Sequence, residues 1–165
     1  MISTWEGYRV LFPIQSTRYN NIIIDWGDGK SNTIAASDKS KYIVHDYSTS
    51  GPHTISVRGQ IAGWSCKNNS FSLCDGLVSI QSYGNVSFGK YAFYGASKLV
   101  SLPLKESPNL SYNMIGTFMG ASSFNQNINF WDTSNITDMS YMFNGAYKFN
   151  QPLDKWNVSK VTIMN

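Results

Sequence analysis

The chain has 165 residues, of which 42% are hydrophobic, 15% aromatic and 14% charged, and its formal net charge is +3 at pH 7. So small and scattered a charge excludes the clustered basic face of a nucleic-acid-binding protein. The longest apolar runs are far shorter than the roughly 18 residues of a membrane-spanning helix, so neither a nucleic-acid partner nor membrane insertion is predicted.

Short β-strands are predicted for the first part of the chain. Residues 21–29 read NIIIDWGDG, a run of β-branched residues followed by a Trp and an Asp-Gly turn signal. From Thr54 to Arg58, polar and apolar residues alternate with a period of two, which is typical of a half-buried antiparallel strand. No helical period of comparable length competes with these patterns, so we expect a small β domain.

These phrases resemble the PKD-type immunoglobulin-like module, in which a strand ending in WGDG precedes a HxYxxxGxYxVxV segment. The matching positions are Trp26 to Gly29, His45, Tyr47, Gly51, His53, Ile55 and Val57, with His53 departing from the usual aromatic residue. The resemblance covers about residues 5–61 and implies a small PKD-like β-sandwich over residues 1–61. Four cations are interpreted as a solvated face of this domain: Lys30, Lys39, Lys41 and Arg58.

Asp25 and Asp28 suggest a calcium site, because hard cations bind carboxylate oxygens. Two carboxylates fall well short of the roughly six ligands required, so we expect them to cap turns by bonding backbone groups instead. His45 is expected to form a hydrogen bond inside the sandwich, since neither it nor His53 has a Cys partner at zinc spacing. The sequence therefore predicts no metal and no cofactor.

A junction is predicted for residues 62–75, where the strand pattern ends. A sandwich of about sixty residues buries only a marginal fraction of its surface, so we expect it to lean on the next unit, with Trp64 at the seam. Cys66 and Cys74 lie in this junction. They would close a small loop in an extracellular setting, while a free or buried pair is an equally open alternative.

A repeat of 25 residues fills the rest of the chain. Phe93, Phe118 and Phe143 open the similar phrases FYGASKL, FMGASSF and FNGAYKF. The same spacing recurs at Gly95, Gly120 and Gly145, at Ala96, Ala121 and Ala146, at Leu99, Phe124 and Phe149, and at Met114, Met139 and Met164. A fixed period of this length is typical of a solenoid, in which each unit packs its large apolar residues on those of the next.

Polar and aromatic residues repeat as well. Asn125 and Asn150 are expected to bond the backbone of the neighbouring unit, which would satisfy buried turn groups. The alternative is a sugar-binding stripe of Asn side chains with Trp131 and Trp156, and it requires these residues to be exposed. Repeated residues more often pack than bind, so the packing interpretation is favoured.

Residues 118–165 resemble the bacterial BspA-type surface repeat, in the variant written FxGAxxFNQPLxxWDVSxVTxMxxMF. The phrase SFNQNINFWDTSNITDMSYMFNGAYKFNQPLDKWNVSKVTIM carries this resemblance, and Leu77 to Pro103 resembles the related BspA leucine-rich repeat. Lys105 to Tyr112 departs from the pattern, with Pro103 and Pro108 nearby. The resemblance implies a solenoid over residues 76–165, with units near 76–92, 93–117, 118–142 and 143–165, the last one incomplete.

The expected fold is mainly β: a small PKD-like β-sandwich followed by a short β-rich leucine-rich-repeat-like solenoid with short helical turns. We expect no enzyme, because there is no Ser, His and acid set at plausible spacing and no phosphate-binding Gly loop. The resemblance implies a surface adhesin or receptor-recognition protein that binds a protein or glycan through a repeat-built face. The alternative is a structural component of a virion or surface layer that packs on copies of itself or on a shell protein.

The repeat is expected to continue beyond Asn165, because the last unit stops where another MF would follow. This predicts an exposed edge that further residues or a partner should cover, and through which the chain could self-associate. The candidate binding residues are those of this edge: Phe143, Phe149, Trp156, Val161 and Met164. No signal peptide is recognised in MISTWEGYRVLFPIQ, and the resemblance implies an extracellular, cell-surface or virion location.

Overall fold

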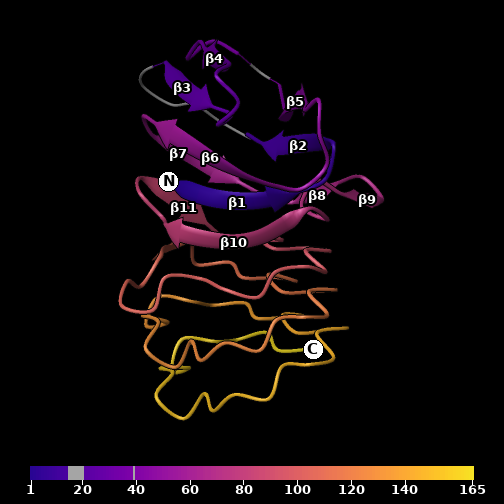
Figure 1. Ribbon diagram of the computed structural model, residues 1–165. Coiled ribbons are helices and arrows are strands. Elements are labelled where there is room, and N and C mark those ends of the chain that lie inside the picture. Colours follow the sequence, from indigo (N-terminus) through magenta and orange to yellow (C-terminus); the bar gives the residue numbers. More distant parts are fainter. Residues whose placement is uncertain (15–20, 39) are drawn as a thin grey trace.

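A computed structural model describes residues 1–14, 21–38 and 40–165 (Figure 1). Residues 15–20 and Lys39, which fall in the predicted sandwich and its predicted solvated face, lie outside the described residues. The described part consists of β-strands and turns, so it is mainly β as predicted, and it contains no helix. Where short helical turns were expected, hydrogen-bonded turns such as residues 90–95 are found instead.

The largest sheet has five strands in the order β10-β1-β6-β3-β4, and all neighbours in it are antiparallel. Its strands are β1 (Ile2–Glu6), β3 (Ile22–Asp25), β4 (Ser31–Ile34), β6 (Pro52–Arg58) and β10 (Leu77–Ser82). In β6 the buried Ile55 and Val57 alternate with more exposed residues, as the period-two pattern predicts. A second antiparallel pair is formed by β2 (Arg9–Pro13) and β5 (Tyr42–Asp46).

Aromatic rings join these two groups of strands. Phe12 of β2 lies 5.8 Å from Trp5 of β1 and 6.0 Å from Trp26, measured between ring centroids. All three side chains are buried, and the Tyr47 hydroxyl donates to the Trp26 carbonyl at 2.9 Å. Burial of such large rings contributes much of the packing energy of a small domain.

The turn after β3 is closed by carboxylates, as predicted. Asp25 Oδ1 accepts from the Gly27 N–H at 2.9 Å, and Asp28 Oδ1 accepts from the Lys30 N–H at 3.1 Å. His45 stacks on Trp26, and its Nε2 lies 2.9 Å from Asp28 Oδ2, so it is hydrogen-bonded within these N-terminal strands. Burial acts to raise the pKa of the Asp28 carboxyl, but the hydrogen bonds from His45 and Lys30 outweigh it and hold the pKa below its ordinary value.

Trp64 is buried and packs between Phe12 and Phe88. It ends β7 (Ile61–Trp64), which pairs in parallel with β11 (Val86–Phe88), and β11 in turn pairs with β12 (Asn109–Leu110). The Trp64 ring lies 5.3 Å from Phe12 and 6.0 Å from Phe88, and its Nε1 donates to the Ala92 carbonyl at 2.8 Å. A short hairpin, β8 (Lys67–Asn68) and β9 (Phe71–Ser72), follows it.

Beneath β10 in Figure 1, successive turns of the chain lie one below another. Parallel bridges join Asn113 to Asp138 and Asp138 to Ile163. Backbone N–H groups donate to the next unit with the period of the sequence: Tyr91 to Ile115, Gly116 to Ser140 and Tyr141 to Asn165, then Phe93 to Thr117 and Phe118 to Met142, and finally Gly95 to Met119 and Gly120 to Asn144, all at 2.8 to 3.0 Å. Each unit is therefore the hydrogen-bonding partner of the next.

Phenylalanine rings form a column inside these turns. The centroid of Phe118 lies 5.2 Å from that of Phe93 and 5.5 Å from that of Phe143. Asn125 Oδ1 accepts from the Asn150 N–H at 2.8 Å, which confirms the predicted bond between units, although both residues are exposed and not buried as expected. Trp131 is only 3% exposed, so it packs in the interior and does not contribute to an exposed sugar-binding stripe.

We predict that Phe118→Ala lowers the free energy of unfolding by about 3–5 kcal/mol, because it opens a cavity between two stacked rings. Phe130 is the matched control, since it lies in the same predicted unit and is 39% exposed. Phe130→Ala should cost less than about 1 kcal/mol. Urea unfolding followed by circular dichroism measures both, and equal losses would contradict the role of the column.

Candidate binding groove

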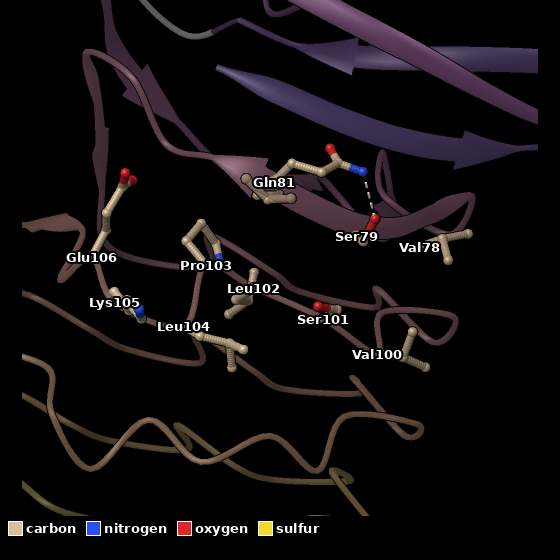
Figure 2. Close-up of a pocket in the computed structure, with 11 residues that line it drawn as sticks. Val78, Ser79, Gln81, Val100, Ser101, Leu102, Pro103, Leu104, Lys105 and Glu106 are labelled. Carbon is tan, nitrogen blue, oxygen red and sulfur yellow. Dashed lines mark hydrogen bonds between the residues drawn. The ribbon is translucent and has the colours of Figure 1, made fainter.

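One surface hollow lies beside β10, with a volume of about 680 Å³, between that strand and residues 100–106 (Figure 2). The Val100 N–H donates to the Val78 carbonyl at 2.9 Å, and the Ile80 N–H donates to the Ser101 carbonyl at 3.0 Å. This pairing ends before Pro103, which has no N–H to donate. The hollow therefore forms where the chain leaves the repeat pattern, as expected for the segment with Pro103 and Pro108.

Several polar groups around this hollow already have partners. Gln81 Nε2 donates to Ser79 Oγ at 3.0 Å and to Thr4 Oγ1 at 2.6 Å. The backbone N–H and C=O of Leu102 are both bonded to the Gln126 side-chain amide, at 2.7 and 2.9 Å. What remains is mostly aliphatic, so the hollow offers few free polar groups to orient a ligand.

A second hollow, which we call the turn groove, follows the glycine turns of the repeats and has a volume of about 500 Å³. Its lining residues are Ser70, Ser72, Tyr94, Gly95, Met119, Gly120, Ser122, Asn144, Gly145 and Tyr147. Most of them occupy corresponding positions in successive units. The groove therefore runs across three units and is built by the repeat itself.

Glycine is required on the floor of the turn groove. Gly95, Gly120 and Gly145 have φ angles of 64°, 76° and 74°, in the left-handed region that favours glycine. A Cβ atom on Gly95 would lie 2.6 Å from the Cβ of Ser72, and one on Gly120 would lie 3.4 Å from the Cα of Gly95. Successive units thus approach closely here, and backbone atoms form the floor.

Side chains form the walls of the groove. Tyr147 is 89% exposed at one end, and Tyr94 is half-buried at the other. The β8–β9 hairpin supplies Ser70 and Ser72, and Ser72 Oγ donates to the Tyr94 carbonyl at 2.7 Å.

A disulfide between Cys66 and Cys74 closes this hairpin. The sequence did not determine whether these cysteines form a disulfide, and the structure shows that they do. Because Ser70 and Ser72 lie between the two cysteines, the bond restrains the wall of the turn groove that the hairpin provides.

The five residues predicted from the sequence belong to the last repeat unit. The rings of Phe143 and Phe149 lie 4.3 Å apart, and Trp156 lies 6.2 Å from Phe143, all half-buried. Phe143, Trp156 and the 63% exposed Met164 line one apolar hollow of about 280 Å³, while Phe149 and Val161 do not line it. Sequence reasoning missed the turn groove, although Tyr94, Met119 and Asn144 share one position of the repeat.

Within the described residues, no three His, Cys, Asp or Glu side chains gather where they could hold a metal ion. In the same part of the chain, no helix is long and apolar enough to span a membrane.

The described residues form an all-β structure with a surface groove built by the repeats. Residues 86–165 match a family described as "Mycoplasma protein of unknown function, DUF285". This match covers the 25-residue repeats and is compatible with the resemblance to a BspA-like surface protein. Searches of curated proteins and of solved structures found no match to the chain.

We predict that reducing the Cys66–Cys74 bond lowers the free energy of unfolding by about 2–3 kcal/mol, the effect expected for a loop of this length. Thermal unfolding with and without a phosphine reductant measures the change. The double variant Cys66→Ser, Cys74→Ser is the control and should not respond to reductant. An intact chain that is equally stable in both conditions would contradict the prediction.

Proposed function

We propose that this chain is a non-catalytic recognition module, a surface adhesin or receptor-recognition element, that binds its protein or glycan ligand in the turn groove. On this proposal the repeats are a BspA-like solenoid and the N-terminal sheets are a PKD-like sandwich that carries it. The observation that supports it best is a groove spanning three repeat units with a backbone floor and a polar, aromatic wall.

The composition of the groove suits recognition. Tyr147 offers a large ring in solvent at a low cost in conformational entropy. Ser70, Ser122 and Asn144 add hydroxyl and amide groups that can donate and accept hydrogen bonds. Since the floor is fixed by hydrogen bonds between units, little ordering is required when a ligand binds.

The disulfide supports the proposed location outside the cell or on a virion. Disulfides form and persist in oxidising compartments and are rare in the cytosol. The Cys66–Cys74 bond closes a hairpin that lines the groove, so an oxidising setting would also preserve the binding surface.

A second candidate function is assembly, with copies of the chain or a shell protein packing on the last unit. We call the exposed apolar side chains of this unit the outer edge: Val158 (47% exposed), Ile163 (45%) and Met164 (63%). Among the described residues, the N–H groups of Phe143 and Gly145 have no partner, whereas those of Phe118 and Gly120 bond the next unit. Unpaired backbone groups beside apolar side chains favour edge-to-edge contact.

For the first candidate, we predict that Tyr147→Ala weakens ligand binding about tenfold, because it removes an aromatic anchor from the groove. Tyr112→Ala is the control, since Tyr112 is 69% exposed but lies outside the groove. A printed glycan array and a panel of extracellular-matrix proteins identify ligands of the intact chain, and biolayer interferometry compares the variants. A chain that binds nothing on either panel, or variants with equal affinity, would reject the groove.

For the second candidate, we predict that the sedimentation coefficient of the intact chain rises with concentration and that Met164→Lys abolishes this rise. A charge on the outer edge cannot be buried in an apolar contact without a large cost. Leu104→Lys is the control, because Leu104 is a 70% exposed apolar residue outside the edge. A monomer at every concentration tested would reject assembly through this edge.

A further inference from the structure

A small basic pocket lies beside the β8–β9 hairpin and has a volume of about 320 Å³. It is lined by Ser65, Lys67, Asn69, Lys90 and Tyr91. The rings of Tyr91 and Tyr94 lie 5.7 Å apart, and Tyr94 lines the turn groove. One pair of tyrosines therefore connects the basic pocket to the groove.

Two ammonium groups gather around one ring in this pocket. Lys67 Nζ lies 4.2 Å from the centroid of Tyr91 and 5.2 Å from that of Tyr94. Lys90 Nζ lies 5.3 Å from the centroid of Tyr91. The negative face of an aromatic ring attracts a cation, so the rings hold both lysines near each other in spite of their like charge.

Neither lysine has a carboxylate partner. The ion pairs within the described residues join Arg9 to Asp46, Lys30 and His45 to Asp28, and Lys98 to Glu6. No acidic oxygen lies within 4 Å of Lys67 or Lys90 in that part of the chain. Two neighbouring cations without a counter-charge favour an anionic ligand.

The pocket depends on an energetically unfavourable backbone conformation at Tyr91. Tyr91 has a φ angle of 60°, in the left-handed region that disfavours side chains. The corresponding residue of the next unit is Gly116, and a Cβ atom there would lie 2.6 Å from the Tyr91 ring. Glycine at position 116 thus makes room for the ring. Lys67 lies in the hairpin closed by the disulfide, and its N–H donates to Ser65 Oγ at 3.3 Å.

We propose that the basic pocket binds the carboxylate or sulfate of an acidic glycan whose chain lies along the turn groove. This inference rests on the proposed function of the groove. Hydroxyl and amide groups line the groove beside exposed tyrosine, which suits a hydroxyl-rich ligand. An extended acidic peptide fits less well, because the floor N–H groups of Gly95 and Gly120 are bonded to the next unit and cannot pair with an added strand.

Isothermal titration calorimetry of the full, oxidised chain tests the proposal with defined probes. Hyaluronan oligosaccharides carry carboxylates, heparin oligosaccharides carry mainly sulfates, dextran oligosaccharides are neutral, and poly-glutamate is an acidic peptide. We expect one or both anionic glycans to bind more tightly than dextran, with an affinity that falls as sodium chloride is raised. The preferred probe of the first two identifies the anionic group.

Lysine variants assign this binding to the pocket. Lys67→Gln and Lys90→Gln should each weaken the anionic glycan about tenfold, because each removes a charge-assisted hydrogen bond. Lys67→Arg should largely retain affinity. Lys41→Gln is the control, since Lys41 is an exposed lysine of the N-terminal domain that lies outside the pocket. Circular dichroism verifies that each variant is folded.

The outcomes separate this inference from the function of the groove. If Tyr147→Ala weakens binding but the lysine variants do not, or if dextran binds as tightly as the anionic glycans, the basic pocket is rejected and the groove remains. If poly-glutamate binds and neither anionic glycan does, the glycan assignment is wrong. If none of the probes binds, the proposal is also overturned.

Discussion

Hydrogen bonds between successive 25-residue units are the constraint on which the repeat half of this protein depends. The N–H groups of Phe93 and Phe118 find their acceptors in the following unit rather than within their own. This pairing fixes the register between units, since a shift of one residue would move each donor away from its acceptor. With the register fixed, Phe118 must lie over Phe143 and Asn125 beside Asn150, and the interior becomes continuous.

The turn groove and the outer edge both follow from this pairing. At the glycine turns the backbones of successive units lie in close contact and form a floor, and neighbouring positions supply the walls. In the last unit the same donors, Phe143 and Gly145, have no partner in the described chain, and Phe143 lines the apolar hollow with Val158 and Met164. The turn groove thus has its backbone groups paired and presents side chains in fixed positions. The outer edge instead presents unpaired backbone N–H groups that another chain could bond.

Sequence periodicity and turn chemistry predicted the contacts that recur in each repeat or lie within one turn. The Phe column, the Asn125 bond and the capping carboxylates Asp25 and Asp28 all follow from spacing or from turn chemistry. It could not predict contacts between segments far apart in the chain. The antiparallel pairing of β1 with β10 and the contact of Lys67 with Tyr91 require the fold to bring them together. The expected helical turns are absent from the described residues, and left-handed glycine ends each turn before a helix forms.

The departure from the repeat near Pro103 shows how much the regular units rely on exact spacing. Trp156 donates its Nε1 to the Ile128 carbonyl at 3.0 Å, but the buried Nε1 of Trp131, one unit earlier, makes no such bond in the described chain. The Tyr83 hydroxyl is buried near Trp131; burial, with the charge of Glu106, raises its pKa, and the hydrogen-bonding interaction with Trp131 opposes this rise. In the same unit the bonds that carry the groove, Gly95 to Met119 and Gly120 to Asn144, remain intact. The irregularity therefore coincides with the aliphatic hollow, while the groove crosses the repeat uninterrupted.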